Sequence, residues 1–133
     1  MPSFAERRRC ELAGQIRARP LPEILTPDEI ATLRVLKIDV EGAEREALVG
    51  LEPMLDSVPD DLEIFLELNP TEYDVDRLLR PIRKRGFRVW IMPYQYEAEY
   101  CLNYSALHRR DNFEELLEVP KQQVDVLISR IRP

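Results

Sequence analysis

The sequence predicts an α/β fold in which a largely parallel sheet is covered by helices. Short, nearly continuous apolar runs alternate with segments whose apolar residues recur at helical spacing, a pattern typical of βαβ units. The chain has 133 residues, which is enough for one domain with one core. Hydrophobic residues make up 44% and charged residues 33%, a balance that favours a folded chain over a disordered one.

The chain is expected to divide into an arm and a domain. Residues 1–20 show no clear hydrophobic period, so they are predicted to form an N-terminal arm that is disordered or partly helical around residues 6–13. Residues 21–133 are predicted to form the folded α/β domain.

The domain is expected to begin with a short helix and a buried strand. Thr26 is a suitable N-cap, Pro27 suits the first helical position and Glu29 suits the third. These residues predict a short helix that ends near Leu33. Residues 35–40 form a nearly continuous apolar, β-branched run, which is typical of a parallel strand buried on both faces.

A second helix and a second strand follow. Apolar residues at helical spacing predict a helix over residues 43–50, with Gly50 as its C-terminal glycine. Pro53 then opens a second short helix that ends near Val58, or else the two are one kinked helix, because proline inside a helix costs about 3 kcal/mol. The apolar run 62–68 predicts the next strand.

The remaining elements repeat this pattern less regularly. An amphipathic helix is predicted over residues 73–86, with a bend at Pro81, and a strand over residues 87–92. A short helix over residues 112–117 and a last strand over residues 124–128 complete the expected elements. Residues 94–110 are polar and aromatic and form the least regular part of the chain. Their aromatic side chains are expected to pack in the core and loop, with a substrate lid over residues 94–104 as the alternative.

The charge of the chain argues against one large class of partners. Lys and Arg number 19 against 25 Asp and Glu, which gives a formal net charge of -6. Proteins that hold nucleic acid through phosphate contacts are normally basic, so no nucleic-acid partner is expected. No apolar run approaches the about 20 residues needed to span a bilayer, and the N-terminus has no hydrophobic signal region. We therefore expect a cytoplasmic protein without a membrane partner.

Glycine and histidine exclude several kinds of site. The four glycines are Gly14, Gly42, Gly50 and Gly86, and the closest two are eight residues apart. A GxGxxG turn or a phosphate-binding P-loop is therefore impossible. His108 is the single histidine and has no second histidine or cysteine nearby, so no metal site and no catalytic triad are expected.

Acidic side chains follow two of the expected strands at the points where they end. Asp39, Glu41 and Glu44 follow the first strand, and Glu67 and Asn69 end the second. In open α/β sheets, ligands bind beyond the carboxyl ends of the parallel strands. These side chains therefore predict a rim of carboxylates that accepts a proton, binds a cation or orients a hydroxyl. The alternative is structural, because the macrodipole favours acidic residues in the first turn of a helix.

The nine residues Leu36–Glu44 read LKIDVEGAE, which resembles the signature of the FkbM family of S-adenosylmethionine-dependent methyltransferases. The resemblance extends over roughly residues 14–130. The later positions that agree are Ala47-Leu48, Gly50, Ile64–Glu67, Asn69-Pro70, Gly86-Phe87 and Asp125–Arg130.

This resemblance implies a Rossmann-like class I methyltransferase sheet, whose strands lie in the order 3-2-1-4-5-7-6 with strand 7 antiparallel. By that order, the runs 35–40, 62–68, 87–92 and 124–130 correspond to strands 4, 5, 6 and 7. Strands 1 to 3 are then missing, together with the glycine-rich turn and the acidic residue that hold the cofactor. The chain is therefore expected to be a partial sheet, the carboxyl-terminal half of such a domain.

The resemblance also implies a reaction and roles for three residues. The family transfers a methyl group from S-adenosylmethionine, and we expect O-methyl transfer to a hydroxyl of a small molecule or glycan. Asp39 and Glu41 are the candidates for orienting or deprotonating that hydroxyl, and Glu67 is the candidate for a supporting contact. Because the cofactor's main cradle is missing, this chain alone is expected to bind S-adenosylmethionine weakly or not at all and to be inactive.

Two other interpretations remain open. In the first, the chain is a non-catalytic α/β module that kept the sheet for binding or dimerisation. In the second, which is the weaker alternative, it carries a cation-binding carboxylate site. Without strand 1, the strand 35–40 lies at an open, apolar edge, and open edges invite pairing. We therefore expect the chain to self-associate through this edge, or its first 30 residues to fold back over it.

Overall fold

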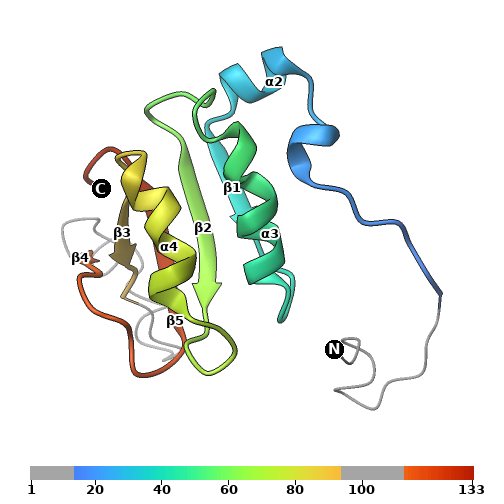
Figure 1. Cartoon of the computed structure of the whole chain (residues 1–133). Coiled ribbons are helices and arrows are strands. Elements are labelled where there is room, and N and C mark those ends of the chain that lie inside the picture. The colour runs from blue at the N-terminus through green and yellow to red at the C-terminus, as the bar shows by residue number, and fades with distance from the viewer. Residues whose placement is uncertain (1–13, 94–112) are drawn as a thin grey trace, which may run out of the picture.

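The computed structural model describes residues 14–93 and 113–133, which form a five-stranded sheet with its two longer helices on one face (Figure 1). The helical elements are η1 (Leu21–Glu23), α2 (Pro27–Thr32), α3 (Glu44–Leu51), η2 (Glu52–Met54) and α4 (Val75–Lys84). The strands are β1 (Val35–Ile38), β2 (Glu63–Leu68), β3 (Arg88–Ile91), β4 (Glu114–Glu115) and β5 (Val124–Ser129). These elements confirm the predicted α/β class.

The strands lie in the order β1-β2-β5-β3-β4. β1 and β2 are parallel, with Val35 beside Glu63 and Ile38 beside Leu66. β5 lies between β2 and β3, although it is the last of these strands in the chain, and runs antiparallel to both. The carboxyl ends of β1, β2 and β3 therefore meet at one edge of the sheet, and β5 begins at that same edge.

Helices α3 and α4 lie side by side over one face of the sheet (Figure 1). The side chains that the strands turn toward them are apolar and buried, among them Ile38, Leu66 and Val126. Leu48 of α3 and Leu79 of α4 complete this core. Burying one such side chain fully stabilises the fold by about 1.5–3 kcal/mol. The helices therefore cover the face of each strand that carries the most apolar side chains. Because side chains alternate along a strand, the intervening residues lie on the opposite face.

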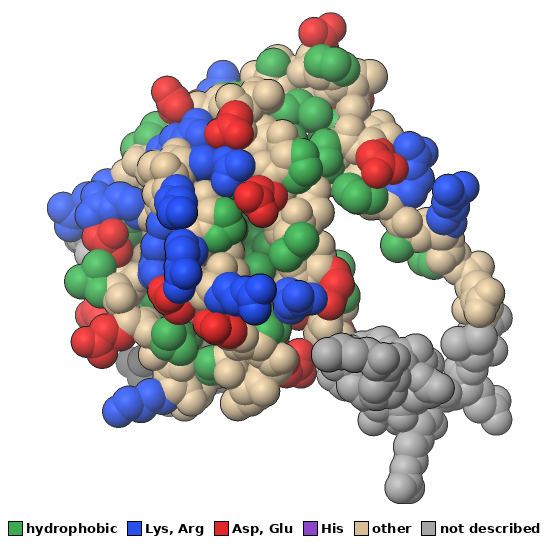
Figure 2. All heavy atoms as spheres, viewed as in Figure 1, with side chains coloured by type: hydrophobic (Ala, Val, Ile, Leu, Met, Phe, Trp, Pro, Cys, Tyr) green, Lys and Arg blue, Asp and Glu red, His purple; other side chains and the backbone are tan. Residues whose placement is uncertain are grey.

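The amphipathic helix predicted over residues 73–86 is present as α4. It begins at Val75, since Asp74 caps it by accepting a hydrogen bond from the Arg77 N–H at 3.0 Å. Its outer surface is solvated, and Figure 2 shows Lys and Arg side chains gathered over it. On that surface Arg80 pairs with Asp76 at 3.0 Å. The helix therefore presents charge outward and its apolar side to the sheet.

The helix predicted to start at Thr26 is confirmed as α2. The Thr26 hydroxyl accepts a hydrogen bond from the Glu29 N–H at 3.3 Å, and the Glu29 carboxylate accepts one from the Thr26 N–H at 2.8 Å. This capping box satisfies backbone donors that the start of a helix leaves open. Ile30 is buried and anchors the short helix against the core.

Gly50 does not end a helix, which corrects the expectation. Helix α3 continues through it to Leu51, because Leu51 is buried and holds this turn against the sheet. The chain then continues as the 3₁₀ turn η2, which contains Pro53. The structure therefore has neither a separate α-helix to Val58 nor a kinked one, since the tighter turn accommodates a residue without an N–H.

Gly50→Ala and Gly86→Ala are expected to change stability in opposite directions. At Gly50 an added Cβ makes only ordinary contact with Pro20 at 3.7 Å. Alanine is favoured inside a helix, so the free energy of unfolding should rise by about 0.5–1 kcal/mol. Gly86 follows α4 with a φ of +84°, which strains any Cβ, so the free energy should fall by about 1 kcal/mol. Urea unfolding measures both, with Gly14→Ala, where the Cβ meets open space, as the control; changes of the same sign would contradict this assignment.

The predicted helix over residues 112–117 is wrong for the part of it that the structure describes. Glu114–Glu115 instead form β4, antiparallel to β3. The Arg88 guanidinium binds the Glu115 carboxylate, with a contact of 2.9 Å, and the buried Leu116 donates its N–H to a β3 carbonyl at 2.7 Å. These long-range contacts outweigh the helical propensity of a short Glu/Leu run.

Other expectations concern residues outside the described ranges. They are the helix around residues 6–13, the packing or lid role of residues 94–104, and the surroundings of His108. Within residues 14–93 and 113–133, no helix is both long and apolar enough to cross a bilayer.

Arg130 follows β5 and ties together segments that are distant in sequence. It donates to the backbone carbonyls of Leu55 at 3.0 Å and Arg85 at 3.1 Å, and to the Asp60 carboxylate at 2.9 Å. Its guanidinium also lies over the Phe87 ring, 4.3 Å from the centroid. This side chain therefore connects the loops at the end of the sheet where β1 and β2 begin.

Candidate functional site

The loop after β1 holds the first group of predicted site residues. Glu41 has a φ of +41° and Gly42 a φ of +99°, so the chain turns through the left-handed region just after Asp39. Glu44 is only 5% exposed, and its carboxylate accepts the Gly42 N–H at 2.9 and 3.1 Å. Glu44 therefore holds the loop, while Asp39 and Glu41 are exposed at the edge of the sheet.

The end of β2 supplies the second group. Glu67 is exposed near the end of the strand. The Asn69 side-chain oxygen accepts from the Thr71 N–H at 3.1 Å and from the Thr71 hydroxyl at 2.7 Å. The Tyr73 hydroxyl accepts from the Asn69 N–H at 3.0 Å, and burial raises the pKa of Tyr73. Asn69 therefore shapes the turn, and Glu67 is the carboxylate that β2 offers to the rim.

Asp39, Glu67 and Asp125 lie in one row across β1, β2 and β5. The parallel register of β1 and β2 brings Asp39 beside Glu67, and the antiparallel register of β2 and β5 places Asp125 directly opposite Glu67. The row lies on the sheet face opposite to the helices and lines a cavity of about 490 Å³. Asp39, Glu41 and Glu67 also line an adjoining cavity of about 360 Å³. The three predicted site residues are therefore brought together.

Lys37 adds a positive charge to the row. Its ammonium lies 2.9 Å from the Asp39 carboxylate, and this hydrogen bond raises the pKa of Lys37. Both side chains are exposed, so the pair orients Asp39 more than it stabilises the fold. Lys37 was not predicted as a site residue, although alternation along β1 places it on the same face as Asp39.

Asp125 is a second rim residue that the sequence interpretation missed. A signal existed, because the family order places an antiparallel last strand beside the second one, which brings its first residues to the rim. Burial raises the pKa of Asp125, and the negative charges of Glu67 and Asp39 raise it further against the opposing effect of Lys37. Asp125 therefore keeps its proton to a higher pH than an ordinary aspartate.

Asp125→Asn is expected to stabilise the fold at neutral pH. Folding raises the pKa of Asp125 above its ordinary value of 3.8, so the ionised form destabilises the fold above the raised pKa. That penalty shrinks as the pH falls through the raised pKa, and it is absent below 3.8. Urea unfolding should therefore show a higher midpoint for the variant at neutral pH and no advantage below pH 3.8, with Glu118→Gln as the exposed control. A difference that does not vary with pH would contradict this explanation.

The rim is suited to binding hydroxyl groups. Carboxylates accept hydrogen bonds from hydroxyls, and hydrogen bonds to an ionised acceptor are stronger than neutral ones. Among residues 14–93 and 113–133, no three His, Cys, Asp or Glu side chains are arranged to hold a metal ion. The geometry described thus offers hydrogen-bond acceptors at the edge of a sheet.

A sheet with helices on one face and polar side chains at the carboxyl ends of its parallel strands defines the class of α/β domains, in which ligands generally bind at that end of the sheet. The family model of the FkbM methyltransferase domain matches residues 14–89, which is more than half of the chain. The chain therefore belongs to the FkbM methyltransferase family. The matched range includes Asp39, Glu41 and Glu67, whereas Asp125 lies beyond it. No curated protein and no solved structure matches the chain at a significant level.

Proposed function

We propose that this chain provides the acceptor side of an S-adenosylmethionine-dependent O-methyltransferase that acts on a hydroxyl of a small molecule or glycan. The observation that supports this is the row of Asp39, Glu67 and Asp125 at the carboxyl edge of the sheet, within a chain of the FkbM methyltransferase family. Hydroxylated molecules donate hydrogen bonds, and this row is built from acceptors.

The strand order supports an assignment to the class I methyltransferase topology. That topology contains the order 4-5-7-6 with strand 7 antiparallel, and β1, β2, β5 and β3 lie in this order with β5 antiparallel. We assign these four strands to positions 4, 5, 7 and 6. In this assignment β1 is strand 4, and strand 1 would continue the sheet along its outer side.

The rim residues fit only part of S-adenosylmethionine. Asp39 and Glu67 suit its positively charged groups and its ribose hydroxyls. The cavity that they share with Glu41 is lined almost entirely by polar residues, whereas an adenine ring needs an apolar slot. The sequence also has no glycine-rich turn. The rim cavity therefore holds no adenine ring, and in this proposal the chain alone is a truncated domain without activity.

In this proposal Asp39 and Glu41 act on the acceptor. The exposed Asp39 carboxylate accepts a hydrogen bond from the acceptor hydroxyl, directs its oxygen and takes its proton when that oxygen is methylated. Glu41 contacts the same acceptor from the turn after β1. Glu67 holds a second hydroxyl of the acceptor, and Lys37 keeps Asp39 in place through the 2.9 Å contact. These residues contribute alignment and one proton transfer.

Titration calorimetry of the chain with S-adenosylmethionine tests the cofactor part of this proposal. The expected result is weak binding or none, because the rim cavity is polar and the glycine-rich turn is lacking. A dissociation constant in the micromolar range would contradict the proposal, and so would transfer of a labelled methyl group to hydroxylated compounds by the chain alone.

A second candidate function, a non-catalytic binding or dimerisation module, is favoured by the open edge of β1. Fusing the chain to the amino-terminal half of a complete FkbM-domain enzyme distinguishes the two. The fusion should bind S-adenosylmethionine and transfer labelled methyl groups to hydroxylated acceptors if the first proposal is right. A folded fusion that binds the cofactor but transfers nothing to any acceptor would favour the module.

A further inference from the structure

Strand β1 ends the sheet on one side, and no described residue pairs with its outer edge. The Arg34 carbonyl accepts the Glu63 N–H at 2.9 Å, so the backbone groups of Arg34 point toward β2. Successive residues of a strand direct their N–H and C=O groups to opposite sides. The backbone N–H and C=O groups of Val35, Lys37 and Asp39 therefore point away from β2. These groups are free to pair with another strand.

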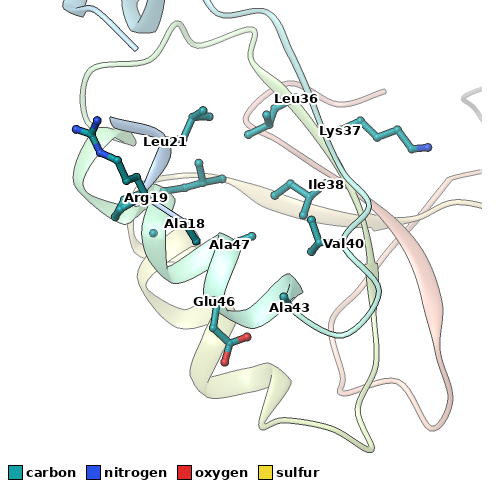
Figure 3. Close-up of a pocket in the computed structure, with 13 residues that line it drawn as sticks. Ala18, Arg19, Leu21, Leu36, Lys37, Ile38, Val40, Ala43, Glu46 and Ala47 are labelled. Carbon is teal, nitrogen blue, oxygen red and sulfur yellow. The ribbon is translucent and has the colours of Figure 1, made fainter. Parts of the chain in front are cut away.

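An apolar groove of about 500 Å³ runs along this edge on the helix side. Leu36, Ile38 and Val40 point toward α3, and Lys37 points the opposite way (Figure 3). Figure 2 shows hydrophobic side chains on both sides of the gap between the N-terminal segment and the body of the molecule. The N-terminal segment 18–21 lines the groove, but it forms no strand against β1. The alternative that the first 30 residues fold back over this edge stays a prediction.

Large apolar side chains remain exposed on both faces of this edge. Val35 is 58% exposed on the face opposite to the helices, and Val40 is 45% exposed beside the groove. Natural proteins normally protect an edge strand with charges, proline or a bulge. Here the Lys37 charge is already paired with Asp39 in the same strand. The edge is therefore suited to a partner strand that carries the same alternation.

We propose that a second copy of this chain pairs with β1 in an antiparallel arrangement, with Lys37 of each copy opposite Asp39 of the other; this pairing rests on the second candidate function, in which no strand 1 of a methyltransferase sheet covers β1. The two sheets then form one continuous sheet around a two-fold axis. This register places Ile38 opposite itself and Leu36 opposite Val40, so apolar side chains meet on the helix side. The two neighbouring registers place Lys37 opposite itself or Asp39 opposite itself, so each of them brings like charges together. Charge complementarity thus selects one register.

The proposed contact also explains the groove. Each copy contributes Leu36 and Val40 to the groove beside α3, where Ala47 of the helix and its N-cap residue Ala43 are small. The two grooves adjoin across the axis, and the apolar side chains of one copy cover those of the other. On the opposite face, two Lys37 and two Asp39 side chains alternate in sign. The surface is therefore self-complementary on both faces of the sheet.

Sedimentation velocity of the full chain over a series of concentrations tests this proposal. Wild type is expected to show a monomer–dimer equilibrium. Lys37→Asp gives the edge two acidic residues and Asp39→Lys gives it two basic ones, so each variant alone should raise the dissociation constant at least tenfold. An equimolar mixture of the two variants should restore the dimer, because the acidic residues of one variant then lie opposite the basic residues of the other. Native mass spectrometry should show that this dimer contains one copy of each variant.

Two further variants complete the test. Lys84→Asp makes the same charge change on the exposed surface of α4 and should leave association unchanged. Val40→Lys alters a side chain already exposed in the monomer and should weaken association without disturbing the fold, which far-UV circular dichroism checks. Wild type that stays monomeric at every concentration, single variants that associate like wild type, or a mixture that does not restore the dimer would each overturn the proposal.

Discussion

Arg130→Ala is expected to lower the free energy of unfolding by about 3 kcal/mol. The substitution leaves the carbonyls of Leu55 and Arg85 without their donor at partly buried positions, and a polar group left unpaired costs about 1–3 kcal/mol. It also removes the guanidinium from the Phe87 ring, a contact worth about 0.5–1 kcal/mol. Domains of this kind have a total stability of about 5–15 kcal/mol, so the loss is large. Equilibrium unfolding in urea, followed by far-UV circular dichroism, measures it.

Two other variants separate the geometry of Arg130 from its charge. Arg130→Lys keeps the charge but lacks the planar fork that reaches several acceptors at once, so it should still lose about 1.5 kcal/mol. Arg132→Ala removes an exposed arginine two positions away and should change stability by less than about 0.5 kcal/mol. If Arg130→Lys were as stable as wild type, a single charge contact would suffice and the proposed fastening of several loops would be wrong.

Asp39→Asn is expected to lower kcat about 100-fold in the fused enzyme described above. The amide keeps the shape of the side chain but does not accept the proton of the acceptor hydroxyl, a function that contributes about 100-fold or more in enzymes. Glu67→Gln should have a smaller effect, about tenfold, because in the proposed mechanism Glu67 positions the acceptor without taking its proton. Initial rates of labelled methyl transfer at saturating S-adenosylmethionine measure both changes.

The controls for Asp39 are chosen to detect a purely structural role. Asp39→Glu retains a proton acceptor and should recover part of the lost rate. Glu118→Gln changes an exposed carboxylate that lines neither rim cavity and should leave the rate unchanged. A fused Asp39→Asn enzyme with unchanged kcat and unchanged KM for the acceptor would show that this carboxylate only pairs with Lys37.

Much of the fold follows from short-range patterns. The runs 35–40 and 62–68 contain the strands β1 and β2, as their apolar residues indicate. The expected burial of both faces of the first run is wrong, because β1 lies at the side of the sheet and Val35 is 58% exposed. The helix at Thr26 follows from a capping box whose groups lie within four residues. The rim of Asp39 and Glu67 was predictable for a related reason, since parallel strands end at the same edge.

The features that were missed depend on contacts between distant residues. β4 forms because Glu115 meets Arg88 and because Leu116 is buried against β3, and local propensity does not encode either contact. Asp125 joins the rim through its register with Glu67, which lies 58 residues earlier in the chain. Gly50 was assigned to a helix end because its local pattern does not show that Leu51 is buried.

The position of β5 between β2 and β3 has a consequence for how the protein is made. The ribosome synthesises β2 and β3 well before Val124–Ser129, so both strands wait with an unpaired edge until this segment emerges. During that interval the nascent chain presents apolar strand edges that are prone to wrong pairing. Once the segment inserts, its pairing with both neighbours closes the centre of the sheet in a single late step. We therefore expect the centre of this sheet to form only after its last strand has been synthesised.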